Sequence, residues 1–348
     1  MDIRHLLGRC TQRQASDMHL VAGMPPLLRI DGDICRLDAE PVAPARVQAL
    51  LKGLMTESQW QQFCAGFECD FAVELPDLGR FRVNAFTQRS GAAAVFRCIP
   101  AQVPSLEQLG LDERFRAIAA SAAGLVCITG PTGSGKSTTL AALIDYLNTQ
   151  SCQHILTIED PVEFLHASKR SLVNQREVHR DTRSFDAALR AALREDPDTI
   201  LVGELRDLET IRLALTAAET GHLVFATLHS SSAAKTVSRI VDVFPAAEKT
   251  LVRALLAESL QAVIAQTLLK RVGGGRVAAH ELMLATPAVR NLIREDKVAQ
   301  LYSTIQTGAQ YGMQTLDQHL QRLVASGQVE PETARATAKT PGVFQHHE

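Results

Sequence analysis

One stretch of the chain, from Gly130 to Thr138, restricts the fold more than any other. An apolar run, Leu125 to Thr129, precedes it, and leucine and isoleucine recur at helical spacing after it. A strand, a glycine-rich turn and a helix in this order form a phosphate-binding loop, and the stretch matches the pattern G-x-x-x-x-G-K-[ST] completely. The predicted nucleotide-binding residues are Gly130, Pro131, Thr132, Gly133, Ser134, Gly135, Lys136, Ser137 and Thr138.

The residue types in this loop suit a nucleoside triphosphate. Glycines let the backbone curl around phosphates and point N–H groups at them, at the positive end of the following helix. We expect Lys136 to reach the outer phosphates and the hydroxyl of Ser137 to hold a magnesium ion. The sequence therefore predicts a site for ATP and Mg²⁺.

Length and composition set the outer limits. The chain has 348 residues, and a typical domain has about 150, so two domains are expected. A formal charge of −2 with interspersed acids and bases favours no nucleic-acid partner. Seven cysteines without a C-x-x-C pair argue against a zinc site and a disulfide framework. No apolar run approaches the roughly 20 residues that span a bilayer, and no secretory signal is recognisable, so we expect a cytoplasmic protein.

Residues 1–99 are predicted to form a small α+β domain. Apolar residues alternate with polar ones along several segments, and Gly32 marks a hairpin turn. The expected strands are 26–30, 34–37, 67–75, 80–86 and 92–99, and the expected helices are 47–55 and 57–64. Pro100 and Pro104 interrupt this pattern, and residues 100–117 are predicted to be a linker.

Residues 118–348 are predicted to form an α/β domain. Apolar strands alternate with amphipathic helices, which indicates a mostly parallel sheet with its ligand at the carboxyl ends of the strands. The expected strands are 125–129, 155–158, 199–202 and 223–227, and the helices between them are 139–147, 185–194 and 208–219. From Glu248 the chain is expected to be helical, because Leu251, Leu255, Leu256, Val263, Ile264 and Leu268 follow one helix face. Gly273–Gly275 would break this pattern, and further helices are expected over 289–305 and 316–324.

Two arginines of the first domain are expected to lie side by side. If the turn after residue 86 is centred near Ser90, Arg82 and Arg97 lie across from each other, on the face opposite the core residues Phe81 and Val83. Like charges repel unless an anion meets them. The pattern leaves two interpretations open, namely an anion-binding pair and two solvated surface arginines.

Carboxylates follow two of the predicted strands. Hydrolysis of a nucleotide requires a carboxylate near the attacking water. Strand 199–202 ends at Gly203 and Glu204, a Walker-B arrangement in which glycine stands where an aspartate often holds the metal. We therefore expect Glu204 to be the base that activates water, and metal support to come from elsewhere.

A second acidic group, Glu159, Asp160 and Glu163, follows strand 155–158. We expect Glu159 to hold the metal together with Ser137, and Glu163 to be a catalytic carboxylate. A solvated acidic loop is the alternative.

Two histidines flank strand 223–227. His229 follows its carboxyl end, where it would approach the terminal phosphate, so we expect it to be catalytic. His222 lies at the opposite end and is expected to be structural, as a helix cap or an interface contact.

Taken together, these stretches resemble the secretion ATPase superfamily, and within it the PilT, or twitching-motility, family of type IV pilus retraction motors. Besides the phosphate loop, residues 155–163 are similar to the family's Asp box, 192–207 to its Walker-B segment and 220–229 to its His box. Ala288 to Glu295 resembles the helix motif specific to retraction motors, with Val289 where isoleucine is usual. Extension motors and type II secretion ATPases share only the earlier boxes.

The resemblance implies a RecA-like P-loop ATPase domain with C-terminal helices, preceded by a PAS-like domain. It also implies a homohexameric ring in which Arg82 and Arg97 reach a neighbour's nucleotide, and in which hydrolysis turns rigid blocks that extract pilin. The implied place is the cytoplasmic side of the inner membrane at the base of the pilus. The implied partners are the platform protein and pilus machinery, with a related second retraction ATPase as a further candidate.

Two other functions remain open from the sequence. One is an extension or type II secretion ATPase of the same superfamily. The other is a nucleotide-gated scaffold that binds ATP without turnover.

Overall fold

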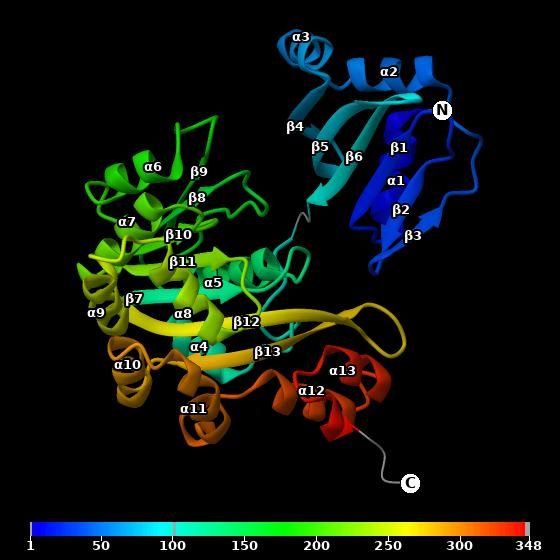
Figure 1. Ribbon diagram of the computed structural model, residues 1–348. Coiled ribbons are helices and arrows are strands. Elements are labelled where there is room, and N and C mark those ends of the chain that lie inside the picture. Colours follow the sequence, from blue (N-terminus) through cyan, green and yellow to red (C-terminus); the bar gives the residue numbers. More distant parts are fainter. Residues whose placement is uncertain (1, 100–101, 345–348) are drawn as a thin grey trace. The chain divides into compact units, whose positions relative to one another are not determined.

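The computed structural model describes residues 2–99 and 102–344, and the chain divides into two compact units between Gln102 and Val103 (Figure 1). Each unit has its own sheet and its own hydrophobic core. Of the predicted linker 100–117, Pro100 and Ala101 lie outside the described residues, as do Met1 and residues 345–348 of the predicted domains.

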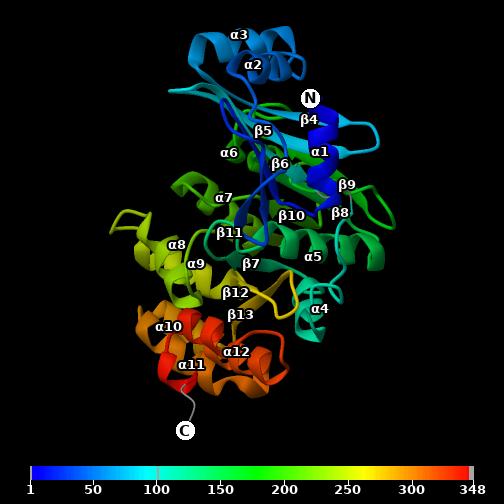
Figure 2. The same cartoon turned by 90° about the vertical axis from the view of Figure 1, so that its right-hand side faces the viewer.

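The first unit is an antiparallel sheet covered by helices, which agrees with the predicted α+β domain. Its six strands have the order β3-β2-β1-β6-β5-β4. The elements are α1 (Ile3–Gln12), β1 (Asp17–Val21), β2 (Leu27–Ile30), β3 (Asp33–Arg36), α2 (Pro44–Lys52), α3 (Glu57–Gly66), β4 (Glu68–Leu75), β5 (Gly79–Gln88) and β6 (Gly91–Ile99). The helix α1 and strand β1 are absent from the sequence-based prediction. Figure 2 shows α2 and α3 lying over the strands.

The two faces of this sheet differ in chemistry. Phe81 and Val83 of β5 and Phe96 of β6 are buried with helix residues such as Leu7 and Leu51 in one cluster. The side chains between them in sequence point to the other face.

The register of β5 with β6 places Arg82 directly opposite Arg97. The sequence-based pairing of these two arginines is therefore confirmed.

Residues 100–117 are predicted to be a linker. From Val103 on, this segment packs within the second unit instead. Leu106, Leu111 and Phe115 are buried in a cluster with Val126 and Leu143. Leu111 and Phe115 are four residues apart, so they follow the face of the short helix α4 (Glu113–Ala119) and its lead-in. The last strand of the first unit ends at Ile99, and the segment from Val103 on belongs to the second unit.

The second unit contains a seven-stranded sheet in the order β13-β12-β7-β11-β10-β8-β9, and all neighbouring pairs except β12 with β13 are parallel. The predicted parallel-rich α/β fold is confirmed. Its first elements are β7 (Gly124–Thr129), α5 (Lys136–Gln150), β8 (His154–Glu159), β9 (Leu172–Glu177), α6 (Phe185–Ala192), β10 (Thr199–Val202), α7 (Leu208–Glu219), β11 (Leu223–Leu228), α8 (Ala233–Asp242) and α9 (Lys249–Ser259).

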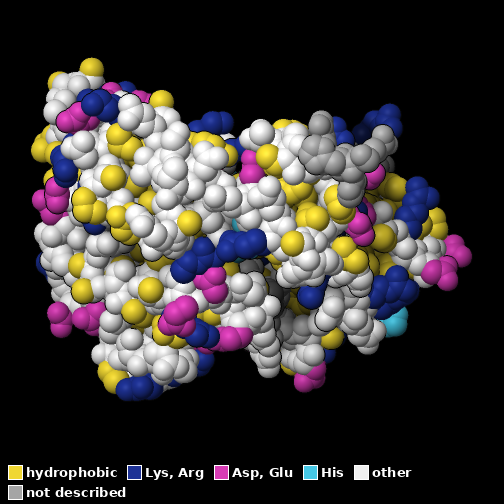
Figure 3. Space-filling model, turned by 90° about the horizontal axis from the view of Figure 1, so that it is seen from below, with side chains coloured by type: hydrophobic (Ala, Val, Ile, Leu, Met, Phe, Trp, Pro, Cys, Tyr) yellow, Lys and Arg dark blue, Asp and Glu magenta, His cyan; other side chains and the backbone are white. Residues whose placement is uncertain are grey.

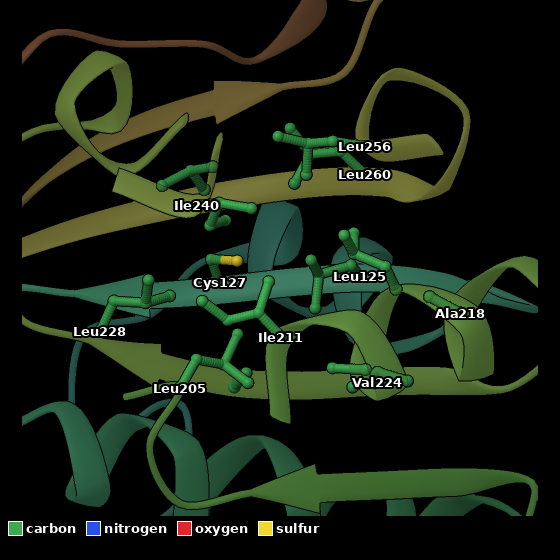
Figure 4. Packing of buried hydrophobic residues seen from close by; sticks show 14 of the residues in the cluster. Leu125, Cys127, Leu205, Ile211, Ala218, Val224, Leu228, Ile240, Leu256 and Leu260 are labelled. Carbon is green, nitrogen blue, oxygen red and sulfur yellow. The ribbon is translucent and has the colours of Figure 1, made fainter. Parts of the chain in front are cut away.

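Helices cover both faces of this sheet, which is why its central strands are buried and mostly apolar. On one face Leu125 of β7 and Val224 of β11 pack against residues of α7, α8 and α9, such as Ile211, Ile240 and Leu256 (Figure 4). On the other face, Val126 and Phe225 pack with residues of α4 and α5. The carboxyl ends of β7, β8, β10 and β11 therefore meet at one edge, where the site is built.

The segment after α9 differs from the prediction. Val263, Ile264 and Leu268 lie in a strand, β12 (Leu260–Lys270), which pairs with β7 and with β13 (Arg276–Leu284). Between two neighbours and under helices, most β12 side chains are buried, so the period of two that marks a strand is lost. The three glycines 273–275, all with positive φ, form the turn of this hairpin.

The C-terminal region is helical, but the predicted helix 289–305 is two helices. The chain turns at Glu295–Lys297, where Asp296 has a φ of 58°. The elements are α10 (Pro287–Arg294), α11 (Leu301–Thr307), α12 (Leu316–Ala325) and α13 (Pro331–Thr337), with short 3₁₀ turns at 298–300, 309–311 and 341–344.

Helix α10 carries the motif Ala288–Glu295 and packs on α9. Val289 and Ile293 are buried, and Nη1 of Arg290 donates to the main-chain oxygens of Ala257 and, at 2.6 Å, of Glu258. These are among the last carbonyls of α9, so Arg290 serves as a C-terminal cap for that helix.

The surface carries both signs of charge. On the face shown in Figure 3, basic and acidic side chains are interspersed among neutral ones. In the described residues, no helix is long and apolar enough to cross a membrane.

Candidate nucleotide site

The phosphate-binding loop connects β7 to α5. Three of its glycines have positive φ, namely Gly130 (150°), Gly133 (77°) and Gly135 (85°). At Gly130, an added Cβ would lie 2.2 Å from the main-chain oxygen of Gln266 and 2.6 Å from Oγ of Ser134. Only glycine fits there, so the loop is held in a tight curl.

Two polar side chains of the loop are suited to bind an anion. Nζ of Lys136 donates to the main-chain oxygens of Gly130 (2.9 Å) and Pro131 (3.0 Å), which are weak partners for a full charge. Burial lowers the pKa of Lys136, while the charges of Glu204 and Glu163 act in the opposite direction. Oγ of Ser134 is buried with no hydrogen-bond partner in the described residues. The phosphates of a nucleotide would provide the missing acceptors for both groups.

Gly203 is explained by close packing. Its N–H donates to the main-chain oxygen of Ile158 (2.8 Å), and an added Cβ would lie 3.2 Å from that oxygen and 3.3 Å from Cα of Glu159. The hydroxyl of Thr227 donates to the oxygen of Gly203. A side chain at this position would therefore make unusually tight contacts with the end of β8, whose backbone would have to shift slightly.

Glu204 and His229 meet at the carboxyl edge of the sheet. Oε1 of Glu204 lies 3.4 Å from Nε2 of His229, and both side chains are partly exposed. The loop after β11 is fixed because Ser230 N donates to Oγ1 of Thr129 (2.9 Å), at the end of β7. Glu204 and His229, which follow different strands, are thus close enough to contact the same reacting group.

Arg206 is a partner of Glu204 that the sequence analysis missed. Its Nε donates to Oε2 of Glu204 (2.7 Å). The side chain of Arg206 is 60% exposed, so water screens this ion pair. No sequence signal marks Arg206, because an arginine two residues after an acid is common on surfaces.

The second acidic group comes together around Glu159. Oε1 accepts from Oγ1 of Thr157 (2.7 Å) and Nε2 of Gln175 (3.3 Å), and Oε2 accepts from Glu163 N (3.3 Å). Burial raises the pKa of Glu159 to about 7, with a smaller contribution from the charge of Glu163. Over residues 2–99 and 102–344, no group of three or more His, Cys, Asp or Glu residues could hold a metal ion.

His222 has a structural environment, at the opposite end of β11. Its Nδ1 lies 3.0 Å from the main-chain oxygen of Ala217 and 3.3 Å from Oγ1 of Thr220. The ring thus contacts the last turn of α7, as the helix-cap interpretation predicts.

The arginine pair belongs to the first unit, and its members differ. Nε of Arg97 donates to Oδ1 of the buried Asp17 (2.9 Å). Arg82 has no ion pair with any residue in the described part of the chain. Asp17 therefore already balances one of the two charges.

The chain is similar to known proteins along nearly its whole length. The profile of the type II/IV secretion system protein family matches residues 2–274. The type IV pilus retraction ATPase PilT of Pseudomonas aeruginosa is 62% identical over 344 residues, covering 99% of this chain and 100% of the relative. A twitching motility protein of Neisseria gonorrhoeae is 57% identical, covering 92% and 86%. The crystal structure of the pilus retraction motor PilT with bound ADP has a TM-score of 0.88 at 46% identity, covering 99% and 98%.

Proposed function

This chain belongs to the type II/IV secretion system protein family, as a type IV pilus retraction ATPase, and from that premise we propose how its residues hydrolyse ATP and withdraw a pilus. The observation that carries the proposal is the meeting of Glu204 and His229 at the edge of the sheet that also holds the phosphate loop. We infer that this carboxylate and this imidazole face the terminal phosphate of a loop-bound nucleotide.

Glu204 acts as the base that takes a proton from the attacking water. Its hydrogen bond from Nε of the exposed Arg206 orients the carboxylate. His229 orients Glu204 and can hydrogen-bond the terminal phosphate. Lys136 and the loop N–H groups bind the outer phosphates.

The residues fit a magnesium ion bound with the nucleotide. The hydroxyl of Ser137 and the carboxylate of Glu159 would hold it, and Glu163 lies beside Glu159 as a further carboxylate. Such an ion would neutralise negative charge on the phosphates of the nucleotide. Because the pKa of Glu159 is about 7, this carboxyl can bind a cation near neutral pH only after losing a proton.

The active form is a homohexameric ring on the cytoplasmic side of the inner membrane. Arg82, which lacks an ion pair among the described residues, reaches the nucleotide of an adjacent subunit, and Arg97 supports it from the next strand. Hydrolysis at one interface then turns rigid units at the next. This rotation extracts pilin through the platform protein of the pilus machinery, with a second retraction ATPase as a candidate partner.

A scaffold without turnover is the main alternative from another class. The test is to purify the chain, measure its mass by light scattering and follow phosphate release with Mg²⁺ and ATP, in the wild type and in Glu204→Ala. The proposal expects a ring with turnover that Glu204→Ala abolishes. A strictly monomeric chain, inert toward ATP even with its membrane partners present, would overturn it.

A further inference from the structure

Gln266, in the middle of β12, lies against both ends of the phosphate-binding loop. It is buried, at 3% exposure. Its main-chain oxygen would be 2.2 Å from a Cβ at Gly130, and its side-chain Nε2 would be 2.9 Å from a Cβ at Gly135. The space that two loop glycines leave free is therefore filled by this one residue.

Hydrogen bonds determine which way the amide of Gln266 points. Its Oε1 accepts from Oγ1 of Thr139 (2.8 Å), and its Nε2 donates to the main-chain oxygen of Ser134 (2.6 Å). Turning the amide over would place its NH₂ group at the Thr139 hydroxyl and its oxygen against a carbonyl oxygen. The amide can therefore satisfy both neighbours only in the observed orientation.

His280 on β13 stabilises this orientation of the Gln266 amide. Its Nε2 lies 3.2 Å from Oε1 of Gln266, and burial lowers the pKa of His280 to about 3, so the ring is neutral. Because Oε1 can only accept, the proton of the neutral ring lies on Nε2. The main-chain N–H of His280 donates in turn to Nδ1 of His319 on α12 (2.9 Å), which anchors β13 to a C-terminal helix.

We propose that Gln266 is a positioning residue for nucleotide binding, which fixes the peptide between Ser134 and Gly135. In a trans peptide the C=O and the N–H point in opposite directions. When Gln266 holds the Ser134 oxygen on the β12 side, the N–H of Gly135 must point to the other side, into the curl of the loop. Gln266 thus aims a phosphate-binding donor without touching the phosphate. This inference rests on the nucleotide site of the proposed function.

Gln261 provides a matched control. It lies on the same strand, and its Nε2 donates to the main-chain oxygen of Ala123 (2.9 Å), beside Gly124 at the far end of β7. Gln261 and Gln266 therefore bond a carbonyl in the same way, but only Gln266 bonds the phosphate loop. Replacement by Met keeps the length of the side chain and removes the amide.

The experiment measures the Kd for ADP by fluorescence and the melting temperature, in the full chain, for Gln266→Met and Gln261→Met. We expect Gln266→Met to raise the Kd by about 10-fold or more, as for a lost buried hydrogen bond, and Gln261→Met to leave the Kd unchanged. If Gln266→Met lowers only the melting temperature and binds ADP like the wild type, the proposal is wrong. A wild type that binds no nucleotide would contradict the proposed function instead.

A second variant tests the same point without relying on Met being tolerated. Gln266→Glu has nearly the same shape, and its carboxyl group can donate to the Ser134 oxygen only while protonated. The ratio of its Kd to that of the wild type should therefore rise between pH 6 and pH 8.5. A constant ratio of one across this range, with the introduced carboxyl shown by titration to ionise below pH 8.5, would overturn the proposal.

Discussion

Nε2 of His229 lies 3.4 Å from Oε1 of Glu204, although the two residues follow different strands of the sheet. Each strand ends one or two residues before its functional side chain, so parallel pairing of β10 with β11 brings the pair together. Arg206 binds the other carboxylate oxygen of Glu204 at 2.7 Å. Glu204 therefore has two partners that can orient its carboxylate.

Glu204→Gln should abolish hydrolysis while preserving nucleotide binding. The amide keeps the shape of the side chain but cannot take a proton, and a general base contributes about 100-fold or more. Phosphate release and ADP affinity are to be measured side by side, with Glu219→Gln, an exposed glutamate at the end of α7, as the control. Unchanged turnover in Glu204→Gln would show that another residue is the base.

Arg82→Ala should slow hydrolysis strongly with little effect on folding. An arginine delivered to the phosphates by a neighbouring subunit can contribute about 1,000-fold or more. Arg97→Ala should slow hydrolysis too, but should also lower the melting temperature, because it leaves the buried Asp17 without its guanidinium partner. Normal ATP turnover in the double variant, with nucleotide binding intact, would show that both arginines are solvated surface residues.

Changes in α10 should separate hydrolysis from retraction. Arg290→Ala and Leu292→Ala are expected to retain ATPase activity and to lose pilus retraction, and Arg290→Ala should cost about 1 kcal/mol of stability through loss of its cap on α9. Lys297→Ala, just beyond this helix, is the control. If both α10 variants retract pili normally, α10 does not distinguish this chain from extension and secretion motors.

A buried histidine, His280, and a partly buried one, His319, should make the second unit sensitive to acid. Burial lowers the pKa of His280 to about 3 and of His319 to about 4, from the usual 6.5. The unfolded chain thus binds more protons, and the stability that these groups provide, complete above pH 6.5, is lost as the pH falls toward 4. The melting temperature of His280→Gln should fall less from pH 8 to pH 5 than that of the wild type or of His5→Gln, an exposed control. An equal fall in all three would show that His280 does not contribute.

The sequence predicted the elements whose patterns are local. Short-range spacing predicts the phosphate loop, the strands that lead to Glu159 and Glu204, and the pairing of Arg82 with Arg97, and the structure contains them. The pairing also depended on the position of one turn, since a shift by one residue would have put the two arginines on opposite faces.

The sequence could not reveal contacts made across the sheet. β12 was predicted as helix because a strand buried on both sides loses its alternation, and Gln266 was then one polar residue in an apolar run. In the sequence, Gly203 stands where an aspartate often holds the metal. Only the structure shows that this residue packs closely against Glu159. The ion pair of Arg206 depends on a side-chain conformation that no residue spacing encodes.

The most direct test of the account is complementation of a deletion strain with the Lys136→Ala form of this chain, scoring surface pili and twitching. Because Lys136 is the residue that would bind the outer phosphates, this form should assemble pili but fail to withdraw them. The account predicts hyperpiliated, immobile cells. Cells without pili would indicate an extension motor, and cells that twitch normally would show that ATP binding at this loop does not drive retraction.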